Sequence, residues 1–233
     1  MVLTTELVER CERPEPDPGP RPDFTPIDPA ELNVLTEKFL NELGGEKLWL
    51  FAYGSLIWKP DFSFVEQRLG TIHGWHRSFC LELKSWRGTP QFPGLMLALD
   101  HGGRCNGVVY RLPDGEHREH IRRLVGREIV AKEDFKMVRW VTVQTASGPL
   151  RALVLWAGPK GKGIALKMPL ERVARVLARA CGHAGSCASY LYNTVLHLEE
   201  LGIHDRNLWR LQELVAGEIQ KSIHPAEVKV VLR

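Results

Sequence analysis

The sequence lacks long hydrophobic runs and a strong net charge. No apolar stretch approaches the roughly 18 to 20 residues that a membrane-spanning helix requires, so no membrane partner is expected. The N-terminus lacks a basic segment followed by an apolar core, which predicts that no secretory signal is present. The formal net charge of +3 over 233 residues is too small to indicate a nucleic-acid partner, although it is compatible with an anionic small-molecule substrate. The sequence leaves the oligomeric state open.

Cysteine is scarce as well. The five cysteines are odd in number, scattered and without a C-x-x-C pair. This pattern argues against a disulfide framework or a zinc ribbon and favours reduced thiols in a cytoplasmic protein. His117 and His120 lie one helical turn apart, but no third ligand is nearby, so a solvated helix face is favoured over a metal site. Cys187 and His183 could form a thiol nucleophile, but cysteine is more often a small core residue.

Proline, in contrast, is concentrated near the N-terminus. Seven of the fifteen prolines fall within residues 14–29, which favours an extended, polyproline-like chain. Residues 1–27 are therefore predicted to form a flexible tail that is dispensable for activity. A helix is predicted over residues 28–46, because Asp28 can cap it and Glu31 completes a capping-box pattern.

The order of the predicted elements indicates the fold class. From residue 48 to about residue 155 the chain is predicted to form mainly strands, with a helix inserted over residues 114–125. The segments 94–100 and 105–112 are predicted to form a hairpin at the paired glycines between them. The last third has helical periodicity. This order predicts an α+β protein, with a mixed, curved sheet or small β-barrel and flanking helices.

The turn formed by Tyr53, Gly54, Ser55 and Leu56 ends the first predicted strand. A strand that ends in Gly-Ser exposes consecutive backbone N–H groups where no Cβ obstructs a ligand. Such groups bind carboxylates or developing oxyanions. Gly and Ser also mark ordinary turns, so both interpretations stay open at this point.

Glu128 is a candidate for acid–base chemistry. It lies just beyond a helix end predicted at Gly126, among apolar neighbours that can raise the pKa of a carboxylate into a useful range. The alternative is a solvated glutamate paired with Arg127 or another cation nearby.

Arg87 is a candidate for substrate binding. It lies in a Gly- and Pro-rich loop, residues 85–95, between two predicted strands. An arginine held there can form a bidentate pair with a substrate carboxylate. The alternative is a surface arginine in a long turn.

Several ordered motifs resemble those of the ChaC family of γ-glutamylcyclotransferases, over about residues 47 to 217. The Y-G-S-L turn is shared with the wider cyclotransferase superfamily, and the R-G-T-P and Y-L-x-N-T blocks narrow the resemblance to ChaC. The motifs, in chain order, are FAYGSLIWKPDF, IHGWHRSFCLE, RGTPQFPGLMLALD, GGRCNGVVYRL, REI and CASYLYNTVLHLEELGIHD.

The resemblance implies a fold, a reaction and site residues. It implies a mixed β-barrel with surrounding helices over residues 47–220, followed by a C-terminal extension, 221–233. The implied reaction cleaves glutathione to 5-oxoproline and cysteinylglycine, with no metal or organic cofactor. The family's substrate loop maps onto the turn at residues 53–56 and its catalytic glutamate onto Glu128. Tyr190, in the Y-L-x-N-T block, is a candidate for the substrate pocket or for core packing.

The chain also departs from the family pattern. Residues 158–168 lack a tyrosine that family members often carry there, and Phe135 stands where a tyrosine is common. These changes leave two alternatives to glutathione cleavage. One is a cyclotransferase for other γ-glutamyl amino acids or amines, and the other is a binding or regulatory module on the same fold.

Overall fold

The structure is a computed structural model and agrees with most of the predicted elements. The helix predicted over residues 28–46 runs from Pro29 to Leu43 as α2, with both hydrogen bonds of the Asp28–Glu31 capping box present. The C-terminal extension lies almost entirely outside the described residues, as does part of the loop 158–168. The residues that the structure describes are 1–19, 25–129, 132–160, 163–164 and 167–221.

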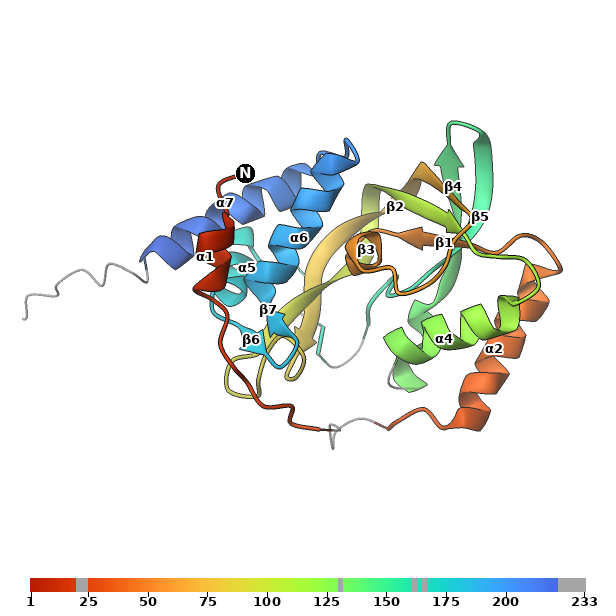
Figure 1. The fold of residues 1–233 in the computed structure, drawn as a ribbon, viewed down its shortest axis with the longest axis horizontal. Helices are drawn as coiled ribbons and strands as arrows, with labels where there is room; N and C mark the ends of the chain where they lie inside the picture. The colour runs from red at the N-terminus through yellow and green to blue at the C-terminus, as the bar shows by residue number, and fades with distance from the viewer. Residues whose placement is uncertain (20–24, 130–131, 161–162, 165–166, 222–233) are drawn as a thin grey trace, which may run out of the picture. The chain divides into compact units, whose positions relative to one another are not determined.

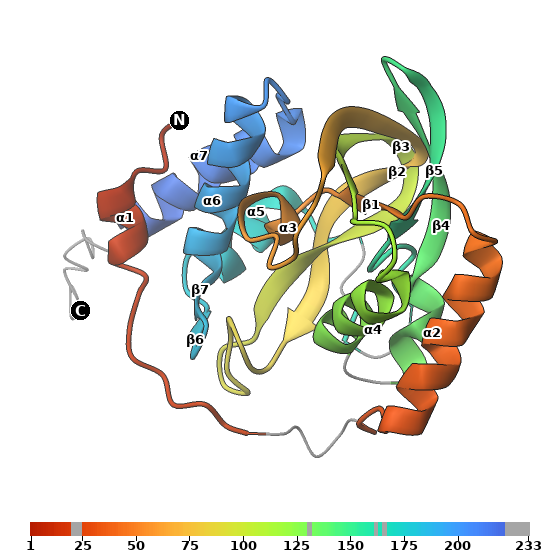
Figure 2. The same cartoon turned by 45° about the vertical axis from the view of Figure 1, so that its right-hand side comes forward.

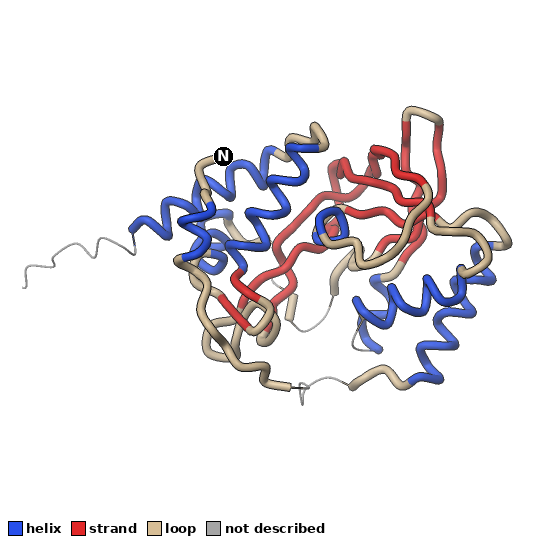
Figure 3. Tube along the Cα trace, in the orientation of Figure 1, coloured by secondary structure: helices blue, strands red, loops and turns tan. Residues whose placement is uncertain are grey.

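Five strands form a closed barrel, which Figures 1 and 3 show. Their order around the barrel is β1-β3-β2-β4-β5. All four residues of β1 are buried, which accounts for the continuous apolar run in this part of the sequence. The strands are β1 (Trp49–Ala52), β2 (Glu66–Leu83), β3 (Gly94–Arg111), β4 (Arg139–Thr145) and β5 (Gly148–Val154).

The hairpin predicted around the glycines of residues 102 and 103 is wrong. Residues 94–111 form the single strand β3, which pairs with the equally long β2. Gly102 and Gly103 adopt positive φ angles of 104° and 71°. Because glycine tolerates these angles, the strand can bend there and continue.

The chain divides into two compact units, each made of separate stretches of sequence. One unit comprises residues 19–78 and 97–164 and contains most of the barrel. In this unit α4 (His117–Glu128) packs against α2, as Figure 2 shows. It also contains the single turn α3 (Ser55–Trp58) and the 3₁₀ helix η1 (Lys132–Met137).

The other unit comprises residues 1–18, 79–96 and 165–233. Within it, α5 packs against α7 and α6 against α7, and the short strands β6 and β7 pair with each other. Its elements are α1 (Thr5–Glu9), α5 (Leu170–Leu177), β6 (Cys181–Gly182), β7 (Gly185–Ser186), α6 (Cys187–Glu200) and α7 (Arg206–Lys221).

The prediction of a flexible tail over residues 1–27 is wrong for its first part. Thr5–Glu9 forms α1, which contacts α6 and α7 (Figure 1). The Leu3 side chain is fully buried, and its N–H donates a hydrogen bond of 2.8 Å to Gln212 Oε1 on α7. The apolar side chains that precede the prolines bury against the helices, a long-range contact that the proline pattern does not reveal.

Among the helices of the described ranges, none has both the length and the hydrophobicity that a membrane span requires.

Candidate active site

The Y-G-S-L turn connects β1 to the short helix α3. Gly54 occupies the N-cap position of α3, and its carbonyl oxygen accepts a hydrogen bond of 2.9 Å from the Ile57 N–H. The first N–H groups of a helix have no acceptor within the helix. Those of Ser55 and Leu56 therefore have no acceptor within α3, and their role as donors to a ligand stays a prediction.

Tyr53 is held through both its side chain and its backbone. Its hydroxyl donates a hydrogen bond of 3.1 Å to the Leu155 carbonyl oxygen, and its own carbonyl oxygen accepts one of 2.6 Å from Arg77 Nε. The side chain is only 7% exposed. The turn thus starts from a fixed point on the barrel, which limits its freedom to move.

Glu128 is the last residue of α4, so the helix end predicted at Gly126 is wrong. Glycine at position 126 destabilises the helix by about 1 kcal/mol relative to alanine. The buried side chains of Leu124 and Val125 stabilise the helix enough for it to continue beyond Gly126. Ile129 caps the helix C-terminus, and its N–H still bonds to the Val125 carbonyl oxygen.

The environment of Glu128 perturbs its titration. Burial raises the pKa of this carboxyl above its ordinary value, and the neighbouring Arg127 guanidinium and a hydrogen bond from the Trp156 side chain offset part of the increase. Arg127 Nε lies 3.3 Å from Glu128 Oε1, and Arg127 Nη1 lies 3.4 Å from Asp61 Oδ2. The ion pair with Arg127 that the alternative interpretation proposed is present, but the Glu128 side chain is partly buried and only 18% exposed.

Trp156 links Glu128 to the Tyr53 turn. Its side chain hydrogen-bonds Glu128, while its carbonyl oxygen accepts from the Leu99 N–H at 2.9 Å and from the Tyr53 hydroxyl at 3.4 Å. Its φ angle is +56°, a conformation that costs a bulky residue about 1 to 3 kcal/mol. Such strain persists only where the surrounding contacts enforce it, as these hydrogen bonds do.

Arg87 and Tyr190 belong to the other unit, where the structure brings them together. The Arg87 guanidinium lies 5.4 Å from the centroid of the Tyr190 ring, and Arg87 Nη1 donates a hydrogen bond of 2.8 Å to the Ser186 carbonyl oxygen. Tyr190 is 3% exposed and its ring meets Phe79 edge-on at 5.9 Å. These contacts favour core packing for Tyr190 and give Arg87 a structural contact in addition to any role toward substrate.

Two residues of the candidate site, Trp156 and Arg77, were not predicted from the sequence. Arg77 is 6% exposed and holds the carbonyl oxygens of Tyr53 and Asn106. The alternation along β2 contained a signal, because Arg77 has the same parity as the buried Phe79 and Leu81. A charged residue at an inward position of a strand indicates a buried polar role. No comparable local signal marked Trp156.

The secondary candidates from the sequence do not form sites. Within the described ranges, no group of three or more His, Cys, Asp or Glu side chains could hold a metal ion. Burial raises the pKa of the Cys187 thiol to about 12, and Cys187 Sγ donates to the Arg87 carbonyl oxygen at 3.1 Å. Cys187 is therefore a core residue, as the more ordinary interpretation held.

The sequence model described as ChaC-like protein matches residues 48–218. The chain belongs to the ChaC family. The relatives of the chain include the glutathione-specific γ-glutamylcyclotransferase of Escherichia coli (strain K12), 36% identical over 162 residues that cover 69% of each chain. The human glutathione-specific γ-glutamylcyclotransferase 1 is 31% identical over 154 residues, 65% of this chain and 69% of the relative.

A solved structure has the same fold as this ChaC-family chain. The crystal structure of the γ-glutamylcyclotransferase specific to glutathione from yeast superimposes with a TM-score of 0.65 at 23% identity. The match covers 73% of this chain and 96% of the yeast chain. The predicted fold class, an α+β protein with a cyclotransferase-like barrel and flanking helices, is confirmed.

Proposed function

We propose that the chain is a γ-glutamylcyclotransferase that degrades glutathione in the cytoplasm. The observation that supports this proposal most is the partly buried carboxyl of Glu128, which has a raised pKa and hydrogen-bonds to Trp156. The names of the relatives in Escherichia coli and human support glutathione as the substrate. A binding module on this fold would have no use for a carboxylate with a raised pKa, which argues against the non-catalytic alternative.

The reaction is an intramolecular displacement. The α-amine nitrogen of the γ-glutamyl group attacks its own γ-carbonyl carbon and forms the C–N bond of 5-oxoproline. The amide C–N bond to cysteine then breaks, and cysteinylglycine leaves with a free amine. Well-oriented cyclisations reach effective molarities of about 10⁵ M or more, so the first task of the site is to hold the substrate folded back on itself.

The second task is proton transfer, which we assign to Glu128. An α-amine with a pKa near 8 is largely protonated at neutral pH, so the ionised carboxylate takes a proton from it. The same carboxyl then delivers that proton to the departing amine nitrogen, and the regenerated carboxylate accepts the second proton that the ring nitrogen loses as the lactam forms. A raised pKa suits this role because it brings the carboxyl closer to the operating pH.

The third task is stabilisation of the oxyanion on the γ-carbonyl oxygen. We assign it to the backbone N–H groups of Ser55 and Leu56 at the start of α3, with Gly54 leaving room for close approach. Tyr53 fixes the start of this turn through its two hydrogen bonds to the barrel. Arg87 and Tyr190 stay predictions for binding the rest of the substrate.

The test is an assay of purified protein with millimolar reduced glutathione, in which 5-oxoproline and cysteinylglycine are measured by mass spectrometry. We expect equimolar products from the wild type. Glu128→Gln should lower kcat by about 10²- to 10⁴-fold, the usual contribution of general acid–base catalysis, while glutathione still binds.

Glu119→Gln is the matched control, because Glu119 lies on the same helix but its side chain is 55% exposed. It should retain full activity. Full turnover by Glu128→Gln would refute the assigned mechanism. Turnover of other γ-glutamyl compounds but not of glutathione would establish the alternative substrate class, and failure across a γ-glutamyl panel would favour the binding module.

A further inference from the structure

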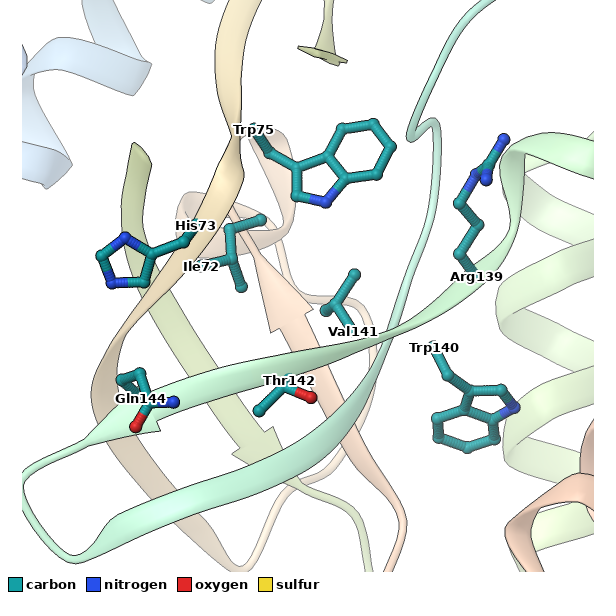
Figure 4. Close-up of a pocket in the computed structure, with 8 residues that line it drawn as sticks. All are labelled: Ile72, His73, Trp75, Arg139, Trp140, Val141, Thr142 and Gln144. Atoms are coloured by element: carbon teal, nitrogen blue, oxygen red, sulfur yellow. The ribbon is translucent and has the colours of Figure 1, made fainter. Parts of the chain in front are cut away.

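A cavity of about 450 Å³ lies beside β2 and β4. The two strands pair at Gly70–Thr145 and Thr71–Gln144, and the cavity is lined by these strands just past that point. Its volume is in the range of small-molecule sites. The lining residues are Ile72, His73, Trp75, Arg139, Trp140, Val141, Thr142 and Gln144 (Figure 4).

Arg139 gives one end of this cavity a positive charge. Its guanidinium lies 5.7 Å from the centroid of the Trp75 ring, and its Nε donates a hydrogen bond of 2.8 Å to the Ala157 carbonyl oxygen. Figure 4 shows Trp75 and Arg139 at one end of the cavity and His73 and Gln144 at the other. Stacking and the Nε hydrogen bond orient the guanidinium while its Nη groups stay available as donors.

No carboxylate neutralises Arg139 within the part of the chain that the structure describes. The lining residues of the cavity likewise include no aspartate or glutamate. A half-buried arginine without an acidic partner, at the wall of a cavity, is suited to an anionic ligand from outside. The planar fork of the guanidinium matches a carboxylate in particular.

The segment of residues 156–158 connects Arg139 with Glu128. The Trp156 side chain hydrogen-bonds Glu128, and the next residue, Ala157, holds Arg139 through its carbonyl oxygen. Gly158 follows with a φ of +75°, and a Cβ there would lie 3.1 Å from Arg139 Nη2. Because glycine has no Cβ, the Arg139 guanidinium fits beside residue 158. The consecutive residues Trp156 and Ala157 hydrogen-bond to Glu128 and to Arg139, respectively.

We propose that Arg139, stacked on Trp75, binds the terminal carboxylate of the leaving group. The enzyme would then select γ-glutamyl compounds whose amine component ends in a carboxylate, such as a dipeptide or an amino acid, over γ-glutamylamines that lack one. The apolar side chains of Ile72 and Val141 line the cavity between its two ends. This inference rests on the proposed function and specifies its substrate class.

The test compares two substrates in steady-state kinetics: glutathione and its analogue with the glycine carboxylate converted to a carboxamide. For the wild type we expect a kcat/KM about 10- to 100-fold higher with glutathione, as charge-assisted hydrogen bonds provide. Arg139→Gln should raise the KM for glutathione by about the same factor and change the constants for the carboxamide by less than about threefold. Arg139→Lys, which keeps the charge but loses the fork, should recover part of the preference.

Arg68→Gln is the matched control. Arg68 lies on β2, and its guanidinium also stacks on a tryptophan, 4.8 Å from the ring centroid of Trp49, which does not line the cavity. It should leave the preference between the two substrates unchanged. If Arg139→Gln lowered kcat/KM equally for glutathione and for the carboxamide, the role of Arg139 would be structural and the proposal would be overturned.

A second measurement needs only the wild-type protein and keeps the proposal falsifiable if Arg139→Gln does not fold. Cysteinylglycine should bind at least about tenfold more tightly than its carboxamide in titration calorimetry, because only the free carboxylate pairs with the guanidinium. Equal affinities would overturn the carboxylate site. Absence of turnover with any γ-glutamyl compound would instead refute the proposed function, and the calorimetry would still decide the carboxylate site.

Discussion

At the scale of single residues, the site depends on polar groups in places where burial is costly. Glu128 is partly buried, with Arg127 and Trp156 as its polar neighbours. Arg77 is buried and donates hydrogen bonds to two carbonyl oxygens. Buried charges are expensive unless they are paired or hydrogen-bonded. The protein tolerates this cost at Glu128 because, under the proposed mechanism, the same burial brings the pKa of the carboxyl toward the operating pH.

The raised pKa of Glu128 predicts a pH-dependent stability difference. The folded protein holds the Glu128 proton at pH values where the unfolded chain has lost it. The stability from this proton is therefore present below the unfolded pKa, near 4.5, and is lost as the pH rises through the folded pKa. Glu128→Gln stays neutral, so its melting temperature should exceed that of the wild type by a margin that grows from pH 4.5 to pH 8.

Differential scanning calorimetry at several pH values measures this margin. Glu119→Gln, which changes an exposed glutamate on α4, should show a flat difference over the same range. A margin for Glu128→Gln that shrinks toward pH 8 would contradict a raised pKa in the folded protein.

The Trp156 hydrogen bond predicts a shift in the pH–rate profile. A hydrogen bond to the carboxylate favours its ionised form and so lowers the pKa of Glu128. Trp156→Phe keeps the aromatic bulk but loses the indole N–H, so the acid limb of the kcat/KM profile should move to higher pH. Trp209→Phe, on α7 where the ring stacks on His204 at 4.9 Å, should leave the limb in place. An unmoved limb in Trp156→Phe would mean that the hydrogen bond does not tune the catalytic carboxyl.

At the scale of elements, the N-terminal segment is joined to the start of α6. The Glu12 carboxylate accepts hydrogen bonds from the Ser186 N–H at 3.1 Å and from the Ser186 hydroxyl at 2.7 Å. Ser186 is the N-cap of α6, and its hydroxyl accepts from the Ser189 N–H at 3.0 Å. A negative charge at a helix N-terminus is stabilising, so Glu12 and Ser186 together complete the helix start.

Glu12→Ala should lower the free energy of unfolding by about 1 to 3 kcal/mol, as loss of charged hydrogen bonds does. Chemical denaturation with circular dichroism measures the change. Glu9→Ala, an exposed glutamate at the end of α1, should change stability by less than about 0.5 kcal/mol. Equal stabilities of the two variants would show that the contact with α6 contributes nothing, and would support the original expectation that this segment is dispensable.

At the scale of the whole molecule, the thiols are excluded from chemistry by the packing. All five cysteines are buried free thiols, and burial raises the pKa of Cys11 to about 11 and of Cys187 to about 12. A glutathione-cleaving enzyme works amid its substrate's thiol, so inert cysteines avoid mixed disulfides with it.

Native protein treated with iodoacetamide at pH 8 should therefore remain unlabelled at Cys187, where only about 1 in 10⁴ of the thiol is ionised. Unfolding in denaturant should expose all five cysteines to the reagent. Intact-mass spectrometry counts the labels in both states. Rapid native labelling of Cys187 would show that the core around α6 opens readily.

The sequence by itself determined several local elements and singled out Glu128 as the candidate carboxylate. The cap of α2 depends on Asp28 and Glu31, three residues apart, and the β4–β5 hairpin closes at Thr145 and Gly148. Such features arise from neighbours along the chain, so propensity and periodicity suffice to predict them. The resemblance to the ChaC family supplied the catalytic role that we propose for Glu128, because the apolar neighbours in the sequence left it open.

Only the tertiary structure decided which distant residues support the site. Tyr53 bonds to Leu155 across 102 positions of sequence, and Leu3 buries against a helix that begins at Arg206. Trp156, strained at a positive φ, and Arg139, held by Ala157, follow ordinary strand patterns in sequence and acquire their roles from closure of the barrel. Local sequence sets the conformation of each segment, whereas burial and long-range hydrogen bonds exist only once the segments have packed together.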